Sequence, residues 1–307
     1  MSRHTSIGII GTGWVGSSVA ISCLHKGITN ELLLADHKTE LAEGEAMDLQ
    51  HGSPFYPAAS VRNARVEDML DTDAIVIAAG RNGGPGQSRL ELLRDNAALA
   101  RELAGALRGY AGIVIMVTNP VDVLTCAFTR YSGLPPERVI GTGTMLDTAR
   151  LRQVLGAHLQ LNPISIHAQV VGEHGDSEVT LWSSAQAGGL PLRQWPGWDR
   201  SAETRVADQV RRAAYEIIRR KGATNHAIGL VTATLLQSVL RDERRILTVS
   251  RVQFGDPSLQ DIALSLPCIV GADGAQQVLQ PPMDATESAG LAHSAEVLRQ
   301  SLKTLFP

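Results

Sequence analysis

Short runs of apolar residues alternate with longer segments of mixed polarity along the first half of the chain. Four of these runs have strand length and carry few polar positions: 7–10, 31–35, 73–79 and 112–117. Strands of a parallel sheet show this pattern because helices cover both of their faces. The segments 15–26 and 39–50 are typical of helices. The repetition of strand and helix predicts a doubly wound parallel α/β sheet with right-handed crossovers.

The pattern changes near residue 142. Longer mixed segments predict helices at 145–158, 202–220, 227–241 and 288–305. Shorter apolar runs predict strands at 164–171, 178–183, 245–250 and 260–269. We therefore predict two domains, the doubly wound sheet at 1–142 and an α+β domain at 143–307. A stretch rich in Gly and Pro predicts a mobile loop inside the first domain, at about 80–90.

The first apolar run leads into a G-x-G-x-x-G, Gly11-Thr12-Gly13-Trp14-Val15-Gly16. Such glycines permit a tight turn and a close approach of the backbone to a pyrophosphate, which sits at the helix N-terminus. Asp36 follows the second predicted strand, and its carboxylate suits ribose hydroxyls and repels a 2′-phosphate. The pattern predicts a Rossmann domain that binds NAD rather than NADP; a purely structural glycine turn is the alternative. The predicted cofactor-binding residues are Gly11, Gly13, Trp14, Val15, Gly16 and Asp36.

Composition excludes several other classes. Apolar residues make up 44% of the 307 residues, charged residues 19%, and the net charge is −3, which gives no support to a nucleic-acid partner. No apolar run reaches the length that a membrane helix needs, and the start of the chain does not resemble a signal peptide. Three widely spaced cysteines, Cys23, Cys126 and Cys268, suit a reduced, cytoplasmic protein. The histidines lack the spacing of metal ligands, so we predict no metal.

Four charged residues suit hydride transfer to a 2-keto acid. His174 stands in a glycine-bounded turn, Asp147 and Arg150 are three apart in a predicted helix, and Arg89 follows the loop at 80–90. Taken singly, they would be a structural turn histidine, a surface ion pair and a solvated arginine. Taken together, they offer a proton donor with its partner, a clamp for a carboxylate and a group that polarises a carbonyl.

The chain resembles the L-lactate/malate dehydrogenase family. The resemblance rests on Asp36, the loop ending in Ser-Arg89 and motifs in family order: GTGWVGSS, MDLQHG, TNPVD, GTGTMLDTARLR, VGEHGDSE and KGAT. The stretches LSLPCIVG and AIG resemble the bacterial lactate branch most. The resemblance implies that His174 is the proton donor and acceptor, that Asp147 orients it and that Arg150 binds the substrate carboxylate.

The resemblance also implies roles for three further residues. Arg89 would polarise the carbonyl, Asn119 would contact the substrate and the nicotinamide, and Thr224 would line the pocket. The implied activity is the reversible transfer of a hydride between NADH and pyruvate, with NAD as the cofactor. Reduction of pyruvate, a 2-keto acid, gives L-lactate, a 2-hydroxy acid. This activity belongs to glycolysis and fermentation.

One position departs from the family pattern. Lactate dehydrogenases usually carry glutamine two residues before the loop proline and malate dehydrogenases carry arginine, whereas this chain has Gly83. Glycine provides no cation for a second substrate carboxylate, which argues against malate unless Arg81 swings in. Glycine also leaves extra room. Pyruvate, a bulkier 2-keto acid and oxaloacetate therefore all remain open, as does a non-catalytic NAD-binding protein.

Arg152 and His167 stand where the bacterial lactate dehydrogenases that respond to fructose 1,6-bisphosphate carry their effector ligands. In those enzymes the site straddles a subunit interface, so the resemblance implies an allosteric homotetramer, with a dimer as the alternative. The simpler interpretation is an ordinary surface residue on a helix and another on a strand.

Overall fold

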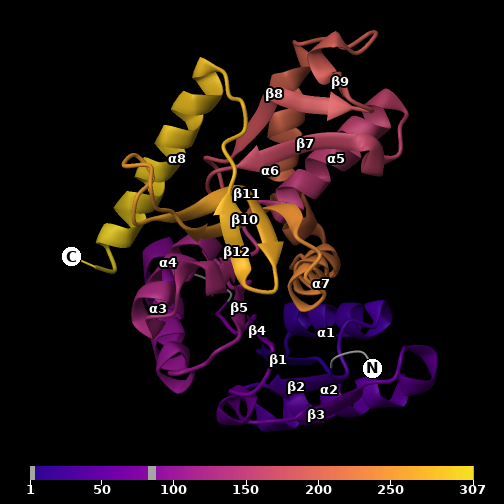
Figure 1. Cartoon of the computed structure of the whole chain (residues 1–307), viewed down its shortest axis with the longest axis vertical. Coiled ribbons are helices and arrows are strands. Elements are labelled where there is room, and N and C mark those ends of the chain that lie inside the picture. Colours follow the sequence, from indigo (N-terminus) through magenta and orange to yellow (C-terminus); the bar gives the residue numbers. More distant parts are fainter. Residues whose placement is uncertain (1–3, 82–87, 307) are drawn as a thin grey trace.

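The structure is a computed structural model that describes residues 4–81 and 88–306. In this part of the chain the strands are β1 (Ser6–Ile10), β2 (Glu31–Ala35), β3 (Ser60–Asn63), β4 (Ala74–Ile77), β5 (Ile113–Met116), β6 (Val139–Gly141), β7 (Ile166–Val171), β8 (Val179–Ala187), β9 (Leu190–Pro191), β10 (Arg245–Val252), β11 (Ala263–Gly271) and β12 (Gly274–Val278). A central sheet has the order β12-β11-β10-β6-β5-β4-β1-β2-β3, and β7, β8 and β9 form a smaller sheet beside it (Figure 1).

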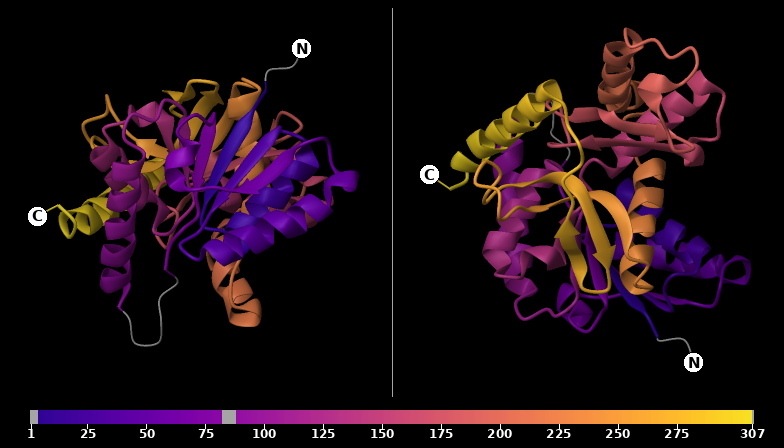
Figure 2. Two further views of the ribbon diagram at one scale, coloured as in Figure 1. Left: turned by 90° about the horizontal axis from the view of Figure 1, so that it is seen from below. Right: turned by 45° about the horizontal axis from the view of Figure 1, so that its top comes forward.

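Helices cover both faces of the central sheet (Figure 2). They are α1 (Trp14–Lys26), α2 (Thr39–His51), α3 (Arg89–Ala106), α4 (Val121–Ser132), α5 (Met145–Leu159), α6 (Ala202–Lys221), α7 (His226–Leu240) and α8 (Ala285–Lys303). None of the helices in the described part of the chain combines the length and the apolar character needed to cross a membrane.

The six strands β1 to β6 pair in parallel, which confirms the predicted doubly wound sheet. The C-terminal strands β10, β11 and β12 then extend it in antiparallel fashion, because β10 pairs with β6 through Ser250 and Gly141. The sheet therefore crosses the domain boundary that we propose at residue 142. This arrangement gives β6 a neighbour on its otherwise open side, where unpaired backbone groups would be exposed.

The sequence pattern missed α3, α4 and the short strands β3, β6, β9 and β12. Helix α3 begins at Arg89, so the end of the predicted loop at 80–90 belongs to this helix. A capping box explains the start: the Ser88 hydroxyl accepts from the N–H of Glu91, and the Glu91 carboxylate accepts from the N–H of Ser88. The missed strands have only two to five residues each, which is a weak basis for a pattern.

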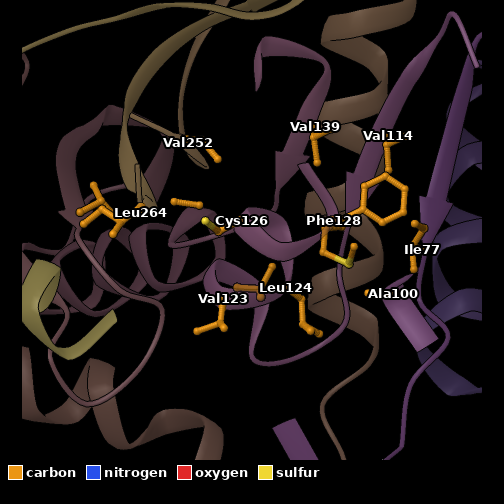
Figure 3. Packing of buried hydrophobic residues seen from close by; sticks show 14 of the residues in the cluster. Ile77, Ala100, Val114, Val123, Leu124, Cys126, Phe128, Val139, Val252 and Leu264 are labelled. Atoms are coloured by element: carbon orange, nitrogen blue, oxygen red, sulfur yellow. The ribbon is translucent and has the colours of Figure 1, made fainter. Parts of the chain in front are cut away.

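The main apolar core lies between the central sheet and helices α3 and α4. Phe128 of α4 is fully buried there, near Ile77 of β4, Val114 of β5 and Ala100 of α3 (Figure 3). Val252 and Leu264 of the C-terminal strands belong to the same cluster. A single core therefore joins the two halves of the chain, and the strand ends that meet above it carry the residues of the site.

Candidate active site

Two glycines of the G-x-G-x-x-G are required by close packing. A Cβ on Gly16 would clash with the carbonyl oxygen of Gly11, and a Cβ on Gly11, whose φ is +94°, would clash with the backbone of Ala79. Gly13 differs, because nothing lies within 4 Å of the position its Cβ would take. This open space lies at the N-terminus of α1, where the helix offers main-chain N–H groups to an anion. Gly11, Gly13, Trp14 and Val15 line a cavity.

The end of β2 places Asp36 beside this turn. One carboxylate oxygen accepts from the N–H of Thr12 at 2.8 Å and the other from the N–H of Lys38 at 3.0 Å. Partial burial raises the Asp36 pKa, but the two N–H groups outweigh it and hold the pKa below its usual value. Asp36 therefore stays ionised at neutral pH and presents a fixed negative charge to the cavity.

The cavity has a volume of about 1710 Å³ and extends from the glycine turn to residues of the C-terminal half of the chain. Of the predicted site residues, its lining brings together Gly11, Gly13, Trp14, Val15, Asp36, Asn119, Arg150, His174 and Thr224. Gly16 is buried beneath the turn and does not line it. A volume of this size exceeds that of most small-molecule pockets, which suits a dinucleotide together with a small acid.

Asp147 of α5 links two residues of the cavity lining, Arg150 and His174. One of its oxygens lies 2.6 Å from Nδ1 of His174, and the other accepts from Nη1 of Arg150 at 2.8 Å. The side chain of Asp147 is 3% exposed and that of Arg150 13%, so the pair is not the surface ion pair that the spacing alone suggests. Because Nδ1 of His174 is bound to Asp147, Nε2 is the ring nitrogen left for proton exchange.

This geometry sets the protonation states. Burial lowers the pKa of His174, but the Asp147 carboxylate more than offsets it and raises the pKa to about 9. Burial likewise raises the pKa of Asp147, while His174 and Arg150 hold it below its usual value. The imidazole is therefore protonated at neutral pH, next to a carboxylate that stays ionised.

Asn119 and Thr224 reach the cavity from different parts of the chain. Asn119 follows β5 and precedes a cis peptide bond to Pro120, and its carbonyl oxygen accepts from the side-chain amide of Asn96 at 2.9 Å. Thr224 lies between α6 and α7. The structure thus brings Asn119 into the same cavity as His174, although 55 positions separate them (174 minus 119).

Two of the predicted site residues lie wholly or partly outside the described residues. Gly83 and the Arg89 side chain lie outside the described residues, although Arg89 is the first residue of α3. The neighbouring Arg81 is described: its guanidinium pairs with Asp95 at 3.2 Å and is mostly exposed. Arg81 lines the cavity, but its guanidinium there is paired with Asp95.

The predicted effector residues lie away from the cavity. Arg152 is half-buried on α5, and its Nε donates to the carbonyl oxygen of Ala168 at 3.1 Å. His167 directly precedes Ala168 on β7, and its side chain is exposed. Burial lowers the Arg152 pKa, and the nearby cation of Arg245 lowers it further. The structure thus brings three basic residues to one region.

The sequence analysis missed two buried acids beside the His174 turn. The carboxylate of Asp122, on α4, accepts from the main-chain N–H of His174 at 2.7 Å. Glu178, just before β8, is buried, and both Asp147 and His174 influence its titration. A signal for Asp122 was present, because it is the single charged residue in the otherwise uncharged run VDVLTCAFT.

Comparison with known proteins identifies the family of the chain. A family model of the lactate/malate dehydrogenase NAD-binding domain matches residues 5–141, and a model of the alpha/beta C-terminal domain of the same family matches residues 144–307. The chain is 42% identical to the L-lactate dehydrogenase of Thermus aquaticus, over 97% of this chain and 99% of that protein. It is 39% identical to that of Kosmotoga olearia, over 98% and 96%.

A solved structure extends the similarity to three dimensions. The crystal structure of the minor L-lactate dehydrogenase from Enterococcus mundtii, in a ligand-bound form, has a TM-score of 0.96 with this structure. The two sequences are 37% identical, and the match covers 98% of both chains.

Proposed function

The chain belongs to the lactate/malate dehydrogenase family, and we propose that it catalyses the reversible, NAD-dependent reduction of pyruvate to L-lactate. One observation carries the proposal. The buried Arg150–Asp147–His174 chain closes one end of a single cavity, and the glycine turn with Asp36 forms the other end. A carboxylate clamp and a proton donor thus share a cavity with a dinucleotide site.

The residues around the glycine turn fit NAD. The open space at Gly13 admits a pyrophosphate at the start of α1, and the carboxylate of Asp36 keeps lone pairs for ribose hydroxyls while it accepts from the main chain. Trp14 and Val15 line the same end, Gly16 lets the turn close, and Asn119 lies toward the substrate end. Bound there, the cofactor supplies or accepts the hydride.

The residues at the other end bind the keto acid and move its proton. A guanidinium has five N–H donors, so Arg150 can keep its bond to Asp147 and also hold the substrate carboxylate. His174 gives the proton of Nε2 to the carbonyl oxygen during reduction and takes it back during oxidation. Asp147 holds the ring in place and stabilises the imidazolium. By the family pattern, Arg89 polarises the carbonyl, and Asn119 and Thr224 complete the pocket.

The raised pKa of His174 gives the proposal a pH dependence. Pyruvate reduction needs the protonated ring, so its kcat/KM should hold through neutral pH and fall as the pH passes about 9. Lactate oxidation needs the neutral ring, so its kcat/KM should rise over the same interval.

A 2-keto-acid panel tests the substrate. We expect NADH-dependent reduction of pyruvate to exceed that of oxaloacetate, because Arg81, the described cation nearest to Gly83 in sequence, pairs with Asp95. A 100-fold preference for oxaloacetate, worth about 2.7 kcal/mol, would instead identify malate as the product. Turnover confined to branched or aromatic keto acids would show that the space at Gly83 admits a bulkier side chain. NADH binding without turnover of any of them would indicate a non-catalytic NAD-binding protein.

We further propose that Arg152 and His167 form part of a site for fructose 1,6-bisphosphate in a homotetramer. Arg152 and Arg245 repel each other, and a phosphate between them would relieve that repulsion. Initial rates at low pyruvate should rise when the sugar bisphosphate is added, and Arg152→Gln should abolish the rise. Unchanged rates and an unchanged sedimentation coefficient would contradict the effector site, and a sedimentation coefficient of a dimer would contradict the tetramer.

We also propose a cytoplasmic location. Cys23, Cys126 and Cys268 are all buried and form no disulfide with one another. Buried thiols of this kind suit a reducing compartment. Cell fractionation with an antibody to the protein tests this: recovery of the protein with periplasmic or secreted markers would contradict it.

A further inference from the structure

Asp122 combines three properties that its place in the sequence does not explain. It is 2% exposed, it lies in the first turn of α4, and it touches the main chain of the proposed proton donor. Burying a carboxylate is costly unless its oxygens are well hydrogen-bonded. Two groups stabilise the Asp122 charge: Oδ2 accepts from the N–H of His174 at 2.7 Å, and the buried hydroxyl of Ser250 faces the same carboxylate.

The contact joins the two halves of the chain. Asp122 lies three positions after Asn119, on the helix that follows β5, and His174 lies in the turn between β7 and β8. The same turn is tied elsewhere, because the N–H of Glu173 donates to the Ser294 hydroxyl at 2.6 Å. The hydrogen bond to Asp122 therefore links the His174 backbone to the helix that follows Asn119.

Resting on the proposed function, we propose that Asp122 is a positioning residue for the proton transfer. Its carboxylate anchors the main chain of His174 to the start of α4. It also places a second negative charge near the imidazole, in addition to that of Asp147. Catalysis depends steeply on such placement, since a shift of about 1 Å in a reacting group costs on the order of 100-fold in rate.

The charges around His174 support the electrostatic role proposed for Asp122. Asp122 raises the pKa of His174, after the larger effect of Asp147, whereas burial and Arg150 lower it. Burial raises the pKa of Asp122 itself to about 6, so the carboxylate is largely ionised at neutral pH. The titratable groups that face this region are Asp147 and Arg150 of α5, Asp122 of α4, Glu178 before β8, and Glu173 in the turn itself.

Two substitutions separate the anchor from the charge. Asp122→Asn keeps an acceptor for the His174 N–H but removes the charge. The new amide can hydrogen-bond to Ser250 Oγ, a buried hydroxyl that faces this carboxylate. Asp122→Ala removes both the acceptor and the charge. Asp199→Asn, on the exposed turn before α6, is the matched control for loss of one carboxylate.

We expect Asp122→Ala to lower kcat for pyruvate by about 10- to 100-fold while NADH binding stays within twofold. Asp122→Asn should recover most of that loss. It should also move the pH midpoint of kcat/KM for pyruvate reduction down by about one unit, because one of the two negative charges is gone. If Asp122→Ala does not fold, the pH midpoint of Asp122→Asn decides alone. An unshifted midpoint, or an Asp122→Ala enzyme with wild-type kcat, would overturn the proposal.

A second readout does not depend on turnover. The His174 ring signal can be titrated by NMR and assigned by its absence in His174→Asn. Its midpoint should fall in Asp122→Asn and stay unchanged in Asp199→Asn. If the wild-type protein reduces no 2-keto acid, the proposed function fails, but this titration still tests the effect of Asp122 on His174. An equal midpoint in Asp122→Asn and wild type would overturn that effect.

Discussion

The two ends of the cavity are built in different ways. At the cofactor end the decisive feature is the absence of side chains at the glycines: Gly11 and Gly16 have no room for a Cβ, and Gly13 leaves open space. At the substrate end the decisive feature is buried charge, shared among Arg150, Asp147 and His174. We therefore expect a side chain at Gly11 or Gly16 to disturb packing and cofactor binding together, and changes at the substrate end to alter chemistry while the fold survives.

The largest expected effect is at the substrate end. His174→Asn keeps a polar group near Asp147 but removes the group that can donate a proton near neutral pH, so turnover should fall by about 1000-fold or more. NADH affinity and thermal stability should stay close to wild type. Steady-state rates, NADH fluorescence titration and a thermal melt measure the three quantities. A substantial residual rate would show that another group supplies the proton.

The next effect tests whether steric exclusion governs the cofactor end. Gly16→Ala places a methyl group against the Gly11 carbonyl and should lower the free energy of unfolding by about 1–3 kcal/mol, together with NADH affinity. Gly13→Ala should weaken NADH binding without lowering stability, since its surroundings are open. Gly44→Ala, at an open position in α2, is the control and should not destabilise. Equal melting temperatures for Gly16→Ala and wild type would show that steric exclusion does not distinguish Gly16 from Gly13.

A smaller effect concerns cofactor choice. Asp36→Ser removes the charge that would repel a 2′-phosphate and weakens the hydrogen bonds to the ribose. Charged hydrogen bonds contribute about 1.5–3 kcal/mol, so the ratio of kcat/KM for NADH over NADPH should fall by about 10- to 100-fold. The exposed Asp71→Asn, which removes one carboxylate outside the cavity, should leave the ratio unchanged. An unaltered ratio in Asp36→Ser would place cofactor selection elsewhere.

The smallest effect lies beside the catalytic pair. Burial, and next the Asp147 charge, raises the Glu178 pKa to about 8. The folded state therefore prefers the protonated acid. This preference is fully present below the ordinary glutamate pKa of 4.5 and is lost as the pH rises through about 8. Glu178→Gln keeps the neutral shape at every pH, so its melting temperature should gain on wild type between about pH 5 and pH 8.

Above about pH 8 that difference should stop growing. Glu296→Gln makes the same chemical change at an exposed position of α8 and should follow wild type throughout. A gap between Glu178→Gln and wild type that does not vary with pH would contradict a protonated Glu178.

Much of the cofactor end could be predicted from local sequence. The strand β1, the glycine turn, α1 and β2 were all expected close to their observed bounds, because apolar runs and glycine spacing report backbone conformation directly. Helix α3 was missed although its capping pair, Ser88 and Glu91, is visible in the sequence. The extension of the sheet by β10, β11 and β12 was not predicted, since strand pairing across about 100 residues leaves no local pattern.

Sequence alone determined which chemical groups this protein has and where its backbone must turn, because glycine spacing and apolar runs act over a few residues. Only the tertiary structure decided which of those groups are buried together. Asp147 and Arg150 have the spacing of a weak surface pair, and their energetic role comes from the segments that cover them. Asp122 and Glu178 became part of the site for the same reason, since the energy of a charge depends on its surroundings and those are assembled from distant parts of the chain.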